Sequence, residues 1–132
     1  MISGIKWVSE LIEIAGGADV FPALADCKNA KDRIVLPARV IAAAPDIIIG
    51  SWCGKKFAPA KLSARPGFDA IPAVRSGWLR EIKSPLILQP GPAALTDGLD
   101  ALSSMIEEWA ARIAMATRCT RSTAQTSALP QR

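Results

Sequence analysis

The sequence predicts an α/β fold, a three-layer Rossmann-like lobe in which helices flank a short, mainly parallel sheet. Two observations lead to this prediction. Residues 46–50 contain three consecutive isoleucines, and a continuous β-branched run is typical of a strand buried on both faces of a parallel sheet. Stretches with helical spacing of apolar residues lie before and after this run. Helices that alternate with strands in this way imply right-handed crossovers between parallel strands.

The N-terminal residues predict a helix followed by a short strand. Apolar side chains recur on one helical face over residues 5–15, and we expect Ser3 to cap this helix. Gly16 and Gly17 should end it, because glycine accepts the left-handed conformation of a helix C-cap. Residues 18–21 are predicted to form a short strand.

The remaining elements are predicted from apolar spacing and from the positions of proline and glycine. In chain order they are a helix over residues 37–44, one or two short helices over 59–71 with a break at Pro66 and Gly67, a strand over 78–82 and a helix over 93–111. Residues 1–111 therefore form the predicted domain. Residues 112–132 carry Arg, Ser, Thr and Ala without an apolar period, which predicts a basic, disordered tail.

Composition excludes several classes of protein. The 132 residues suffice for one domain, and their three cysteines are too few for a disulfide framework or a zinc cluster. The chain has no histidine, which removes the commonest general base and metal ligand. Residues 1–109 hold 12 basic and 12 acidic side chains, so the net charge of +4 belongs to the tail. A neutral body argues against nucleic-acid binding.

Apolar runs and the first residues bear on location. No apolar stretch approaches the ~20 residues of a membrane span. The start of the chain lacks the pattern of a secretory signal. We therefore expect this chain to be cytoplasmic, and a full-length exported parent to be periplasmic.

Two segments follow the predicted strands directly, where ligands bind in open parallel sheets. One is residues 50–56, with the sequence GSWCGKK, and the other is residues 83–92. Trp52 offers a rigid, flat surface to a ligand. The first segment is one residue too short for a phosphate-binding loop, and Lys56 stands where that loop needs a hydroxyl. A cysteine-dependent enzyme would use Cys53 as nucleophile with Lys55 as activator, but no base accompanies them.

Three segments, taken in order, resemble a known family. They are WVSELIEIAGG at residues 7–17, PDIIIGSWCGKK at residues 45–56 and SPLILQPGP at residues 84–92. Together they resemble the C-terminal lobe of cobalamin-binding proteins, in the ABC-transporter substrate-binding superfamily of periplasmic-binding proteins with a helical backbone. The resemblance extends from residue 2 to about residue 109. It implies a binding module, not an enzyme, for a corrinoid such as cobalamin, a haem-like compound or an iron siderophore.

The resemblance also implies site residues and partners. The ligand-binding residues by position are Ser51, Trp52, Cys53, Gly54, Lys83, Ser84 and Gln89; no catalytic or metal-binding residue is expected. The expected partners are an ABC permease and an N-terminal lobe that has no counterpart in this sequence. No acidic residue lies between Asp46 and Asp69, so no permease-docking residue is assigned. The alternatives are a truncated remnant without independent activity and the enzyme that uses Cys53.

Overall fold

The computed structural model describes the backbone of residues 1–126 and the side chains of residues 1–118. Two short strands pair in parallel, with Ile48 opposite Leu79 and Gly50 opposite Glu81. In chain order, the elements are α1 (Lys6–Ile14), η1 (Pro22–Asp26), η2 (Ala30–Arg33), α2 (Pro37–Ala43), β1 (Ile48–Gly50), α3 (Pro59–Ser63), η3 (Phe68–Ala70), α4 (Pro72–Arg75), β2 (Leu79–Glu81), α5 (Ser84–Ile87), η4 (Ala94–Gly98) and α6 (Leu99–Thr126).

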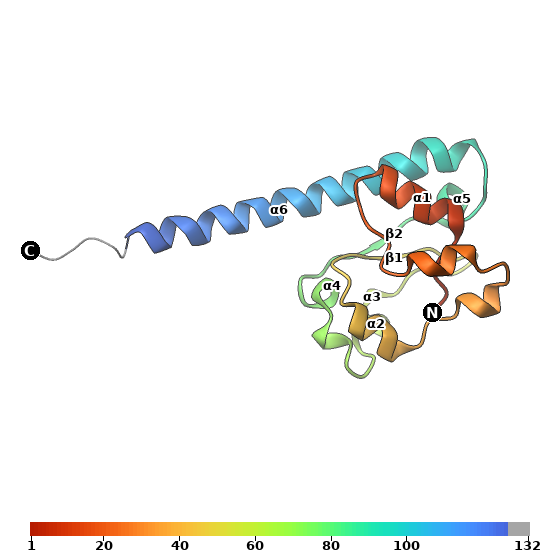
Figure 1. Cartoon of the computed structure of the whole chain (residues 1–132), viewed down its shortest axis with the longest axis horizontal. Coiled ribbons are helices and arrows are strands. Elements are labelled where there is room, and N and C mark those ends of the chain that lie inside the picture. Colours follow the sequence, from red (N-terminus) through yellow and green to blue (C-terminus); the bar gives the residue numbers. More distant parts are fainter. Residues whose placement is uncertain (127–132) are drawn as a thin grey trace, which may run out of the picture.

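The two strands lie between two layers of helices. Figure 1 shows α1, α5 and the first turns of α6 on one side of β1 and β2, and α2, α3 and α4 on the other. Neighbouring residues of β1 point to opposite sides, so Ile48 belongs to the apolar cluster under α2 to α4 and Ile49 packs against the cluster under α1, α5 and α6. The predicted α/β fold with a short parallel sheet is confirmed.

Each layer has its own core. The first is built around Trp78, Phe68 and Ile71, each at most 2% exposed. The second is built around Leu11, Ile82, Ile87, Ala94 and Leu102. Burial of these large side chains is the main favourable contribution to folding, because the sheet itself contributes few backbone hydrogen bonds.

Most predicted elements are present. The helix over residues 37–44 is α2, the break at Pro66 and Gly67 separates α3 from η3, and Gly16 has the left-handed φ of +85° that ends α1. The predicted strands contract to Ile48–Gly50 and Leu79–Glu81.

Two predictions near the N-terminus are wrong. Ser3 does not cap α1, which follows Ile5 without any side-chain cap. Residues 18–21 form no strand, because the Asp19 carboxylate accepts hydrogen bonds from the Ser9 hydroxyl and from the Phe21 amide. A carboxylate that binds the amide two residues further on holds the backbone in a turn.

The C-terminal helix is longer than predicted. The predicted helix over 93–111 begins with the π-helical turn η4, and α6 then continues to Thr126. Residues 112–126 of the predicted disordered tail are therefore helical, while residues 127–132 lie outside the described residues. No glycine or proline occurs between Leu99 and Thr126, so no helix-breaking residue ends the helix earlier. Within the described part of the chain, no helix combines the length and apolar character needed to cross a bilayer.

The loop that follows β1 turns back onto the strand. The half-buried Phe57 ring lies against the Gly50 backbone, in the space that a side chain at position 50 would occupy. Gly50 itself is buried. The absence of a Cβ at this position therefore allows the loop of residues 51–56 to close.

We predict that Gly50→Ala destabilises the fold by about 1–3 kcal/mol, because the added methyl group overlaps the Phe57 ring. Urea denaturation measures the change in the free energy of unfolding. Gly91→Ala is the matched control, since a Cβ at Gly91 meets no atom within 4 Å. Equal midpoints for the two variants would show that the ring does not constrain position 50.

Candidate functional site

The two predicted binding segments begin at the same edge of the sheet. The Ile82 amide donates a hydrogen bond to the Gly50 carbonyl at 3.1 Å, so β1 and β2 end side by side. The segment from Ser51 follows β1, and Lys83 follows β2. This carboxyl edge is the position at which open parallel sheets bind ligands.

The first segment is a loop that is closed at its base. The Phe57 amide donates a hydrogen bond to Glu81 Oε1 at 2.9 Å, which ties the end of the loop to β2. Gly54 has a φ of +74° with open space around it, and glycine adopts this left-handed conformation without strain. We call residues 51–56, closed by Gly50 and Phe57, the β1 loop.

The tip of the β1 loop is exposed. Trp52 is 57% exposed, and Cys53, Gly54, Lys55 and Lys56 are also exposed. Singly exposed apolar side chains are common on protein surfaces, so the position of Trp52 at the carboxyl edge, and not its exposure alone, makes it a candidate. At the base of the loop Ser51 is half-buried, and its Oγ is buried without a hydrogen-bond partner in the described structure.

The second segment is less uniform. Lys83 is exposed next to the β1 loop, whereas Ser84 is only 7% exposed at the start of α5. Gln89 is exposed beyond the far end of α5. No hydrogen bond within residues 1–118 joins Gln89 to the β1 loop. The structure therefore places Lys83 at the same edge as the β1 loop, buries Ser84 and leaves Gln89 exposed after α5.

The charge at this edge is positive. Lys55, Lys56 and Lys83 are exposed around it, while the nearby carboxylate of Glu81 is hydrogen-bonded to the Phe57 amide. Exposed like charges that gather at one edge raise the local potential and attract anions, an effect that added salt reduces.

Residues 1–86 match the family of periplasmic binding proteins. This match spans about two thirds of the chain and includes β1, β2 and the whole β1 loop. The chain belongs to the periplasmic binding protein family. No curated protein and no solved structure matches the chain.

Membership of the periplasmic binding protein family supports a ligand-binding role within a substrate-binding protein. Such proteins are typically not enzymes and deliver a small ligand to an ABC permease. The family also indicates a periplasmic location for a full-length parent. The described residues contain no group of three or more side chains able to hold a metal ion. Within residues 1–118, the Cys53 thiol has no hydrogen-bond partner.

Two shallow grooves of this binding protein lie away from the carboxyl edge, each of about 250 Å³. One lies between α6 and α4, and the other between α1 and residues 90–95. Neither contains a residue of the β1 loop, and sequence reasoning predicted neither. Both grooves depend on how segments far apart in the sequence pack against each other. One sequence signal pointed to the first groove: Trp109 and Ile113 continue the helical spacing of the earlier apolar residues of α6.

We predict that Glu81→Ala loosens the base of the β1 loop without unfolding the domain. Hydrogen exchange at the Phe57 amide should accelerate roughly tenfold, because its acceptor at 2.9 Å is removed. Amide exchange followed by NMR measures this rate. Glu13→Ala on α1 removes an equally exposed carboxylate and should leave Phe57 unchanged; an unchanged Phe57 rate in both variants would contradict the role of Glu81.

Proposed function

We propose that this protein is the C-terminal lobe of a bilobal binding protein and that its carboxyl edge holds a corrinoid, such as cobalamin, or a related metal chelate. The observation that carries the proposal is the position of Trp52, 57% exposed at the tip of a loop that is closed at its base. The other residues of the proposed site are Ser51, Cys53, Gly54, Lys83, Ser84 and Gln89.

An exposed indole favours a flat, largely apolar ligand. Covering about 100 Å² of apolar surface contributes about 2.5 kcal/mol, and an indole on a rigid loop loses little conformational freedom when it binds. The macrocycle of a corrinoid or of a haem-like compound presents such a face. The closed base of the loop supports this use, because it holds Trp52 outside the core before any ligand arrives.

The positive edge favours a ligand that carries negative charge. Lys55, Lys56 and Lys83 can approach carboxylates, or the phosphate of a corrinoid side chain. Because of these lysines, anionic chelates remain candidate ligands together with cobalamin. They include iron siderophores and haem-like compounds with carboxylates. The enzyme alternative has no comparable support, since the chain contains no histidine.

A single lobe contacts only one side of its ligand. If two lobes together give about −12 kcal/mol and each contributes half of the contacts, one lobe retains about −6 kcal/mol, which corresponds to a Kd of tens of micromolar. The proposed ligand should therefore bind this chain measurably but weakly. Delivery to an ABC permease is proposed only for a protein that contains both lobes.

We predict that Trp52→Ala weakens binding of cyanocobalamin by at least about tenfold, because it removes the flat surface under the macrocycle. Isothermal titration gives the Kd, and tryptophan fluorescence quenching gives an independent one. Leu95→Ala is the matched control, with a side chain that is 67% exposed away from the carboxyl edge. Identical titrations for the wild type and Trp52→Ala would refute the site.

Lys55→Glu combined with Lys83→Glu should reduce binding of an anionic chelate more than binding of cyanocobalamin. We expect the Kd for hemin to increase roughly tenfold, because two positive charges that attract its carboxylates become negative charges that repel them. Titrations at low and high salt measure the effect, which should diminish at high salt. Lys6→Glu combined with Lys28→Glu gives the same change in net charge at exposed positions of α1 and the loop before η2; an equal loss in that control would show that only net charge matters.

A further inference from the structure

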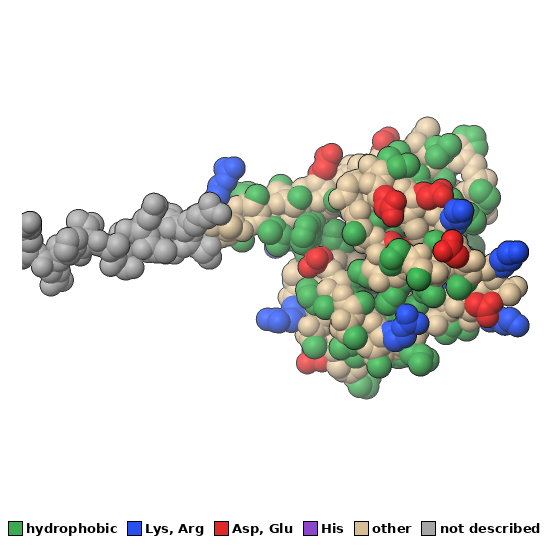
Figure 2. All heavy atoms as spheres, in the orientation of Figure 1, with side chains coloured by type: hydrophobic (Ala, Val, Ile, Leu, Met, Phe, Trp, Pro, Cys, Tyr) green, Lys and Arg blue, Asp and Glu red, His purple; other side chains and the backbone are tan. Residues whose placement is uncertain are grey.

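The apolar face of α6 continues beyond the part of the protein that covers it. Leu102, Ile106, Trp109, Ile113 and Ala116 are spaced by four, three, four and three residues, the heptad spacing of helices that pair with another helix. Leu102 is 1% exposed and Trp109 packs against the core, whereas Ile113 is 48% exposed. Figure 1 shows the C-terminal part of α6 projecting from the rest of the molecule, and Figure 2 shows hydrophobic side chains, in green, where the helix leaves the body.

A groove lies where the projecting helix leaves the body. Its lining comes from α6, from the end of α4 and the residue after it, and from the residues before the two strands: Trp109, Arg112, Ile113, Ala116, Pro72, Ser76, Trp78 and Asp46. We call this hollow of about 250 Å³ the α6 groove. Most of its lining is apolar side chain, so a helix with an apolar face can fill it.

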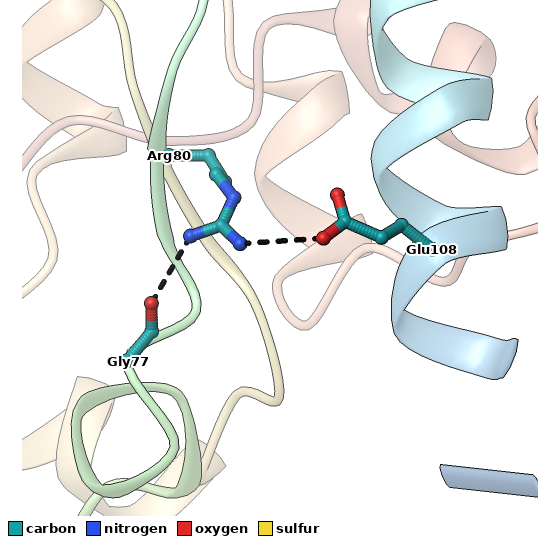
Figure 3. Close-up of polar contacts among 3 residues, drawn as sticks. All are labelled: Gly77, Arg80 and Glu108. Atoms are coloured by element: carbon teal, nitrogen blue, oxygen red, sulfur yellow. Dashed lines mark hydrogen bonds and ion pairs between the residues drawn. The ribbon is translucent and has the colours of Figure 1, made fainter. Parts of the chain in front are cut away.

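Charged groups on β2 and α6 add contacts to the apolar packing of Leu102 and Trp109 where α6 leaves the body. Arg80 donates to the Gly77 carbonyl at 3.1 Å and forms an ion pair with Glu108 at 3.9 Å, as Figure 3 shows. The guanidinium groups of Arg80 and Arg112 also lie over the Trp78 ring, at 4.3 and 5.6 Å from its centroid. These contacts hold α6 against the start of β2, so the α6 groove is formed before any partner binds.

The charges of α6 are divided along its length. Residues 99–108 contain Asp100, Glu107 and Glu108 without a basic residue, and residues 109–126 contain arginines without an acid. Asp46 and Arg112 both line the α6 groove, so the two formal charges of its lining balance. The apolar part of the lining suits a helix with an uncovered apolar face. The charges that select the partner are those of α6 itself, whose first half is acidic and whose projecting half is basic.

We propose that the α6 groove binds α6 of a second copy of this chain, in an antiparallel pair whose two-fold axis lies near Ile113. A parallel pair would place arginines beside arginines and acids beside acids, whereas the antiparallel pair brings Arg118 of each copy toward Glu107 and Glu108 of the other. The 17 residues from Ala110 to Thr126 extend about 25 Å, which is long enough for helix pairing. The match to the binding protein family ends at residue 86, and the inference does not depend on the proposed ligand.

Sedimentation equilibrium of the full chain over roughly 1–100 µM tests the proposal. We expect a dimer in the wild type, and an increase of at least about tenfold in its dissociation constant for Ile113→Asp. Val20→Asp is the matched control, because Val20 is 44% exposed and lies outside the α6 groove. Circular dichroism verifies that each variant remains folded.

A charge exchange tests the direction of the pair. Glu107→Arg should weaken the dimer, and Glu107→Arg combined with Arg118→Glu should restore it, because the opposite charges meet again across the two-fold axis. A wild type that stays monomeric throughout this range overturns the proposal, whatever other protein it binds. The proposal is also overturned if Val20→Asp dissociates the dimer as much as Ile113→Asp does, or if the double variant dimerises as weakly as Glu107→Arg alone.

Discussion

The packing of the Phe57 ring on the Gly50 backbone is the constraint on which the carboxyl edge depends. The ring takes the space of the missing side chain, and the Phe57 amide reaches the Glu81 carboxylate on the neighbouring strand. Together these contacts return the chain to its starting point within seven residues, and the side chains from Trp52 to Lys56 face outward. The exposure of Trp52 is therefore imposed by contacts inside the protein, and a ligand would meet a surface that is already in place.

The parts of the fold that local sequence determines were predictable. Three consecutive isoleucines at residues 47–49 identified the buried strand, and glycines and prolines marked most helix ends. The parts that depend on distant contacts were not. The turn at Asp19 requires the hydroxyl of Ser9, and the π-helical turn before α6 accompanies the close approach of Gly98 to the Leu86 carbonyl. No periodicity in a single segment reveals such pairs.

The same distinction applies to the candidate site. The sequence predicted that the β1 loop and Lys83 would lie at one edge, because each follows a predicted strand and neighbouring parallel strands end at the same edge of a sheet. The burial of Ser84 could not be inferred in this way, because it depends on the short helix α5, which begins at Ser84 and turns the chain inward. The α6 groove depends on how α6 packs against the body through Leu102 and Trp109, and Arg80 adds contacts with Glu108 and Trp78 there.

The one-sided form of the carboxyl edge has a kinetic consequence. A surface that touches only one face of a small molecule cannot enclose it, so departure requires no opening motion. With an association rate constant of about 10⁶ M⁻¹s⁻¹ and a Kd of about 10 µM, a bound molecule would stay for about 0.1 s. So short a residence time allows rapid exchange with free ligand. Slow dissociation would require a second lobe that covers the other face of the ligand.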